Sequence, residues 1–88
     1  MEKFIWVFNG ENGRFPSGVF SDVEIAKQWI EKHQLSGILT RYPLDTGVYD
    51  WAVKNDHFKI TKDKHKTPLF IGLFSSAHQE HIHFESGK

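Results

Sequence analysis

The residue types best suited to chemistry lie near the end of the sequence, where His81, His83 and Glu85 alternate with apolar side chains. If residues 80–85 are extended, the period of two places these three side chains on one face, with the imidazoles about 6.6 Å apart at ~3.3 Å per residue. Imidazole and carboxylate groups bind Zn²⁺ and similar divalent ions, and His78 could reach in from the preceding turn. The favoured interpretation is still a solvated strand face. The chain has six histidines in 88 residues, so a His-x-His pair occurs easily by chance. Without a metal, the pair could respond to pH.

A second candidate site is the polar stretch at residues 9–14, which contains two Asn-Gly pairs. Such pairs readily adopt positive φ and are typical of a tight turn between two strands. Amides and side chains in this turn could also hold an anion or contact a partner, with an arginine as the charged anchor. The glycine spacing matches neither a P-loop nor a dinucleotide-binding motif, and the turn alone explains these residue types. The candidate binding residues are Asn9, Glu11, Asn12 and Arg14.

Residues 59–66 contain four lysines and one aspartate, which could form a basic patch against phosphate groups. The stretch lacks arginine and interleaved aromatic residues, and the chain has no net charge, so we expect a solvated loop and no nucleic-acid partner.

The three tryptophans fit core positions. Tyr49 is a further candidate binding residue, because its hydroxyl could line a groove.

Nucleophilic catalysis finds little support in the sequence. The chain has no cysteine and no Gly-x-Ser-x-Gly motif, and Ser75 and Ser76 are close to histidines only in sequence. Asp45 and Asp50 are typical of carboxylates at a helix start. We therefore expect a protein that is not an enzyme and has no cofactor, the divalent metal considered above being the alternative.

The elements that would position these residues begin with a β-hairpin and a helix. Residues 4–8 are β-branched and aromatic, and residues 14–20 return as a second strand after the polar turn. Ser21 and Glu24 match a capping box, and the helical spacing of apolar residues that follows predicts a helix over 22–34.

Further along the chain the pattern predicts a second set of elements. These are a strand over 38–42, a short helix capped by Asp45 or Thr46 and ending at Asn55, and strands over 69–74 and 80–85. The order ββαβαββ predicts an α+β fold, with a mostly antiparallel sheet of about five strands covered by one long and one short helix.

Composition limits the class of protein. The chain has 88 residues, 39% of them hydrophobic, with 11 basic and 11 acidic side chains, which predicts a single compact domain over residues 1–88. The absence of cysteine favours a reducing compartment, so we expect a cytoplasmic protein. No stretch reaches the length of a signal-peptide apolar region or of the ~20 apolar residues of a membrane span, so no membrane association is expected.

Three stretches resemble a family of short, uncharacterised bacterial proteins that share a domain of unknown function. They are WVFNGENGRFPSGVF at residues 6–20, YDWA at 49–52 and FSSAHQEHIH at 74–83. The resemblance implies a compact bacterial domain and supplies no catalytic residues.

Two functions from different classes follow. The favoured one is a non-enzymatic binding module that engages another protein through a sheet edge, the hairpin turn or an aromatic groove, as a small accessory or immunity-like protein would. A homodimer through a sheet edge is open, since an unpaired terminal strand can pair with its own copy. The alternative is a small metalloprotein, such as a hydrolase, that uses His81 and His83.

Overall fold

The computed structural model describes residues 3–88, and their contacts divide the chain into two compact units. The first, here the sheet unit, runs up to Leu44 and resumes at Gln79–Lys88. The second, the helical unit, is Asp45–His78. The single domain expected over residues 1–88 stays a prediction. No helix within residues 3–88 is long and apolar enough to span a bilayer.

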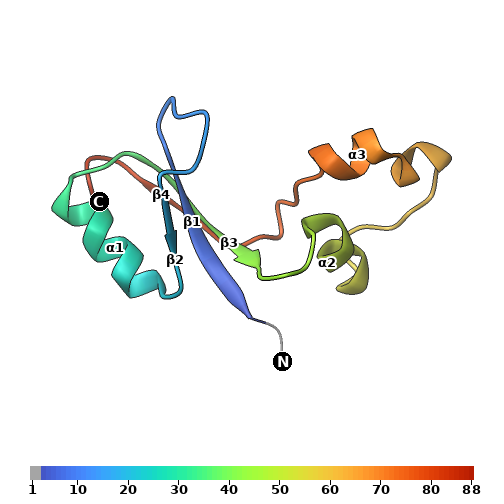
Figure 1. The fold of residues 1–88 in the computed structure, drawn as a ribbon, viewed down its shortest axis with the longest axis horizontal. Coiled ribbons are helices and arrows are strands. Elements are labelled where there is room, and N and C mark those ends of the chain that lie inside the picture. Colours follow the sequence, from blue (N-terminus) through green and yellow to red (C-terminus); the bar gives the residue numbers. More distant parts are fainter. Residues whose placement is uncertain (1–2) are drawn as a thin grey trace. The chain divides into compact units, whose positions relative to one another are not determined.

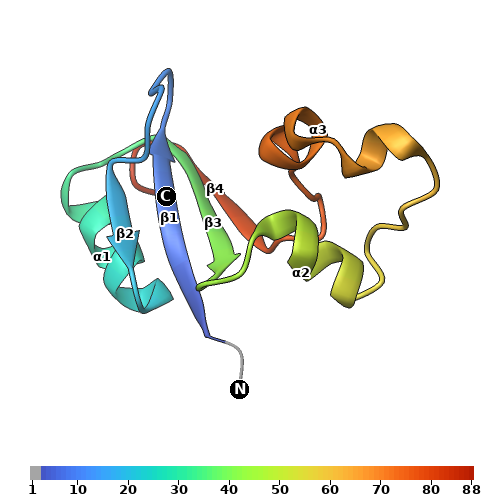
Figure 2. The same cartoon turned by 45° about the vertical axis from the view of Figure 1, so that its right-hand side comes forward.

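The sheet unit is built on four antiparallel strands. They are β1 (Phe4–Gly10), β2 (Gly18–Phe20), β3 (Gly37–Pro43) and β4 (His81–Phe84). Their order across the sheet is β2-β1-β3-β4, and Figure 2 shows them side by side. The two ends of the unit's sequence therefore meet in one sheet, because β4 pairs with β3.

The predicted hairpin is confirmed, with a shorter second strand than expected. β1 and β2 pair with Val7 opposite Val19, and the loop between them is the narrow excursion beyond the sheet in Figure 1. The amide of Gly13 donates to the carbonyl of Gly10 at 2.9 Å, and Asn12 has a φ of 66°. The second Asn-Gly pair thus supplies the positive φ that the turn needs.

Helix α1 (Val23–Lys32) is confirmed within the predicted range 22–34, but its predicted cap is wrong. The N-cap is Asp22, whose carboxylate accepts from the Glu24 amide at 2.7 Å, so Ser21 lies one residue outside the helix. An aspartate is a strong N-cap because its charge also complements the helix dipole.

The core of the sheet unit lies between α1 and one face of the sheet. The strand register places Trp6 and Phe8 of β1 on this face together with Leu39 of β3. Ile30 of α1 is fully buried against them, and Trp29 meets the Phe8 ring edge-on at 5.9 Å. The spacing of apolar residues in sequence thus matches the observed core.

The last residues of the chain are tied to the end of α1. The Gly87 amide donates to the Leu35 carbonyl at 2.8 Å, and the Ser86 amide donates to Ser36 Oγ at 2.9 Å. The C-terminal end of β4 is therefore held against the rest of the sheet unit.

The helical unit begins with α2 (Val48–Lys54). Its N-cap is Gly47, so the predicted caps Asp45 and Thr46 are wrong, whereas the predicted C-cap Asn55 is confirmed. The Trp51 carbonyl accepts from both the backbone amide of Asn55 at 3.0 Å and its side-chain Nδ2 at 2.8 Å, so Asn55 holds the helix end with two hydrogen bonds.

The strand predicted over 69–74 is wrong, because this segment forms α3 (Pro68–Leu73) after a short 3₁₀ turn at Asp63–Lys66. Thr67 caps the helix by accepting from the Phe70 amide at 3.2 Å, and Pro68 occupies its first position, where a missing N–H costs nothing. The sheet accordingly has four strands in place of five. The class remains α+β, with three α-helices in residues 3–88.

Candidate functional site

β4 is an edge strand, and within residues 3–88 no strand pairs with its outer side. The Arg41 amide donates to the Glu80 carbonyl at 2.9 Å, so this pair of residues is hydrogen-bonded. Bonded and non-bonded pairs alternate along an antiparallel ladder, so the backbone groups of Ile82 also face β3. The N–H and C=O groups of His81 and His83 therefore point away from the sheet. We call these four groups the β4 edge.

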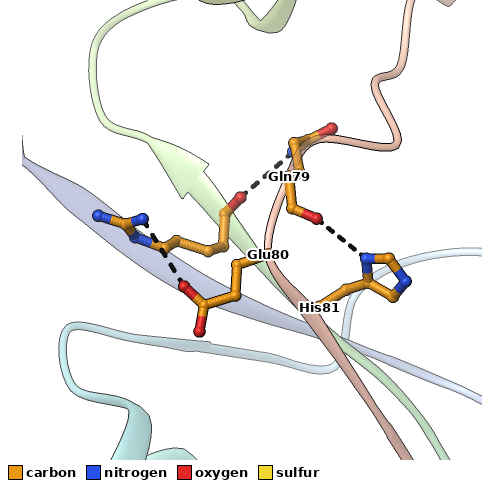
Figure 3. Close-up of polar contacts among 4 residues, drawn as sticks. Gln79, Glu80 and His81 are labelled. Carbon is orange, nitrogen blue, oxygen red and sulfur yellow. Dashed lines mark hydrogen bonds and ion pairs between the residues drawn. The ribbon is translucent and has the colours of Figure 1, made fainter.

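A set of interactions fixes the start of β4, as Figure 3 shows. Gln79 is only 6% exposed and donates from Nε2 to the Arg41 carbonyl at 3.3 Å. The Arg41 guanidinium carbon lies 3.5 Å from the centroid of the Phe4 ring, and Nη1 lies 3.7 Å from Glu80 Oε1. The ion pair is too exposed to add much free energy, so the buried glutamine and the ladder are the main restraints on this end of the strand.

The side chains of His81 and His83 lie on the sheet face opposite α1, as the period of two predicts. Their ring centroids are 5.3 Å apart, and His81 Nδ1 lies 2.9 Å from the Gln79 carbonyl oxygen. Glu85 does not complete a ligand set with them, because residues 3–88 contain no group of three or more histidine or acidic side chains placed to hold a metal ion. The strand thus supplies two imidazoles, which are fewer ligands than a protein metal site needs.

A shallow depression of about 860 Å³ lies at the same end of the sheet as the hairpin turn. We call it the tip depression. It is lined by residues 9–12, 36–38, 83–86 and Lys88. The Glu11 amide donates to the Ser36 carbonyl at 2.9 Å, which holds the turn against the start of β3.

The tip depression joins the two candidate sites that the sequence presents as separate. Asn9, Glu11 and Asn12 come from the hairpin, and His83 and Glu85 come from the end of β4. They meet because β3 lies between β1 and β4 and pairs with both. The result is a mixed polar surface directly beside the β4 edge.

The other predicted site residues lie elsewhere. Arg14 is exposed and does not line the depression, and His81 lies farther along β4. Tyr49 belongs to the helical unit, where it is 8% exposed and its ring meets those of Phe70 and Phe74 with centroids 6.3 and 5.6 Å away. We therefore assign Tyr49 to the aromatic core of that unit.

Sequence reasoning missed two groups of surface residues. Ser36, Gly37 and Lys88 line the tip depression, although the Ser-Gly pair indicates only the end of a helix when the sequence is considered alone. Leu69 and Leu73 are 74% and 76% exposed on α3, where the sequence predicts a strand. The Thr-Pro pair before them, a cap followed by a first-turn proline, was the signal that could have found them.

Comparison with known proteins identifies a family. The model of a family described as a domain of unknown function, DUF7710, matches residues 5–88. No curated protein and no solved structure matches the chain. The resemblance expected from the three sequence stretches is confirmed at the level of such a family.

Proposed function

The chain belongs to the DUF7710 family of domains of unknown function, and from its surface we propose that it is a non-enzymatic binding module that takes an extended segment of a partner protein along the β4 edge. A small accessory or immunity-like protein of the bacterial cytoplasm fits this role. The cysteine-free composition supports the compartment.

The observation that supports this proposal most is the outward direction of the backbone groups of His81 and His83, with which no strand in residues 3–88 pairs. An added strand needs donors and acceptors repeated every second residue, and the β4 edge has this spacing. Main-chain bonds of this kind give affinity without regard to sequence, so specificity must come from side chains. The tip depression lies beside His83, where it could receive side chains of the added strand.

The edge lacks two of the features by which proteins prevent strand addition, namely proline and lysine within the strand. Both ends of β4 are fixed to the rest of the sheet unit. The opposite edge strand, β2, has only three residues and follows Pro16 closely. The binding surface is therefore proposed on the β4 side of the sheet.

Selection from a phage-displayed random peptide library tests the proposal. The full chain serves as bait. Counter-selection against a His83→Pro variant, which lacks one outward N–H of the β4 edge, removes peptides that bind elsewhere. We expect enriched peptides that bind the parent and are rich in β-branched and aromatic residues. A library with no peptide that prefers the parent over the variant would contradict the proposal. If the protein dimerises through β4 and no peptide binds, the occupant of the β4 edge is a second copy of the chain and not a partner protein.

The metalloprotein remains a second candidate, and one observation favours it. When the proton is on Nδ1, His81 donates it to the Gln79 carbonyl, which leaves Nε2 free to bind a metal. Metal-binding histidines are commonly oriented in this way. A site on this strand would still need ligands beyond the two imidazoles.

We expect tag-free protein, purified without added metal or chelator, to contain no stoichiometric zinc, nickel or manganese, because two imidazoles alone hold such ions weakly. Elemental analysis beside a His81→Ala/His83→Ala variant checks this. Metal present at one equivalent in the parent and absent from the variant would reverse the order of the two candidates.

A further inference from the structure

The helical unit has an apolar surface that its own core does not use. Leu69 and Leu73 lie one turn apart on α3 and are 74% and 76% exposed. Beside them, Phe70 and Phe74 form part of a groove of about 440 Å³, which we call the α3 groove. Two large side chains held so far out of contact are costly to leave in water, since burying one leucine is worth about 1.5–3 kcal/mol.

The two faces of α3 have different roles. Phe70 and Phe74 turn toward the aromatic core, where their rings lie 5.6 and 5.1 Å from that of Phe58. Leu69 and Leu73 are offset from these residues along the helix and complete the groove from outside. Packing in the core therefore explains the positions of Phe70 and Phe74, but it does not explain why Leu69 and Leu73 are exposed.

One lysine lines the α3 groove, and the segment that leads into the helix is rich in lysine. The lining residue is Lys64, and the segment at residues 59–66 has four exposed lysines against the single acidic residue Asp63. Within the part of the chain that the structure describes, none of these lysines is in an ion pair. An apolar groove lined by one lysine and preceded by a lysine-rich segment is complementary to a ligand that is apolar on one side and acidic beside it.

We propose that the α3 groove docks an acidic amphipathic helix of a partner protein. Apolar side chains spaced three or four residues apart would enter the groove between the leucines and the aromatic floor, and carboxylates would face the lysines. The described elements of this unit are helices and no strand, so it offers no sheet edge for an extended ligand. The ligand class thus differs from that of the β4 edge, and the inference goes beyond the proposed function.

A synthetic helix of about 18 residues, five turns, tests the proposal. It carries leucines on one face and glutamates on the rest, and fluorescence anisotropy with the full chain reports its binding. We expect saturable binding that Leu69→Ser/Leu73→Ser weakens by at least about tenfold, as loss of buried leucine area requires. Lys64→Glu should weaken binding several-fold and reduce its dependence on salt.

Two matched substitutions in the sheet unit serve as controls. Ile25→Ser removes an apolar side chain that is 53% exposed on α1, and Lys32→Glu reverses an exposed lysine on the same helix. Neither should change the affinity for the acidic helix. His83→Pro should also leave it unchanged, so failure at this groove and failure at the β4 edge are distinguishable.

Four results would overturn the proposal. The first is no saturable binding up to about 1 mM peptide. The second is equal binding of a peptide whose glutamates are replaced by lysine, which would remove the charge argument. The third is binding of phosphatidylserine vesicles in place of the peptide, which would make the groove a membrane contact. The fourth is concentration-dependent self-association lost in the leucine variant without peptide binding, which would make a second copy the occupant.

Discussion

Replacing Gly37 by alanine is expected to destabilise the sheet unit by about 3 kcal/mol. Gly37 begins β3 with a φ of +155°, and a Cβ there would overlap the Asn9 carbonyl oxygen and lie 2.9 Å from the Gly10 Cα. These atoms belong to the neighbouring backbone, so they cannot move without opening the β1–β3 ladder. The Phe8 ring, fully buried in the core, would lie 2.8 Å from the same Cβ and could not yield either.

Gly72→Ala is the matched control for this substitution. A Cβ at Gly72 meets no atom within 4 Å, and the residue lies inside α3, where alanine is the better helix former. We expect this variant to be more stable by up to about 1 kcal/mol. Urea unfolding followed by tryptophan fluorescence compares the two variants. Equal stability of Gly37→Ala and the parent would mean that β1 and β3 do not approach as closely as described.

The second large effect is expected on binding. His83→Pro should weaken the binding of the parent-specific peptides by at least about tenfold, because it removes a main-chain donor that the added strand would use. The proline ring would also occupy space on the outer side of β4, where edge strands use proline to prevent pairing. The sheet itself should keep its stability to within about 1 kcal/mol, since the lost N–H does not belong to the β3–β4 ladder.

His83→Ala separates the backbone from the side chain. Alanine keeps the N–H of residue 83 and removes the imidazole that lines the tip depression. We expect peptides to retain most of their affinity for this variant in a titration calorimeter. Loss of binding in both variants to the same degree would place recognition on the imidazole and would contradict a role for the edge.

Local patterns in the sequence predict the sheet unit well. The run of β-branched and aromatic residues at 4–8 and the helical spacing after residue 22 supply the two sides of the core, and both appear in the structure. The second Asn-Gly pair, Asn12-Gly13, places the turn. These features depend on neighbours in sequence, which is why they can be read from it.

The segment at residues 69–74 shows where such reasoning fails. A short apolar run fits a buried strand and a helix equally well, and its period alone does not separate them. Thr67 and Pro68 decide for a helix, because they cap it and pre-set its first turn. Tertiary contacts of Phe70 and Phe74 with the other rings then stabilise it.

The candidate site could be predicted only in pieces. The residues of the hairpin and of β4 were identified separately, and nothing in the sequence says that β3 lies between them. Strand order depends on pairings between residues far apart in the chain, such as Ile38 with His83 and Asn9. The direction of the free backbone groups on β4 follows from the same long-range register.

Amide hydrogen exchange along β4, measured by NMR on ¹⁵N-labelled full chain, is the most direct test of the free edge. In the free protein we expect fast exchange at His81 and His83 and slow exchange at Ile82 and Phe84, whose amides face β3. A selected peptide should slow amide exchange at His81 and His83 and leave the exchange rates of Ile82 and Phe84 unchanged. Protection of all four amides in the free protein, or no added protection at His81 and His83 when the peptide is bound, would contradict strand addition at β4.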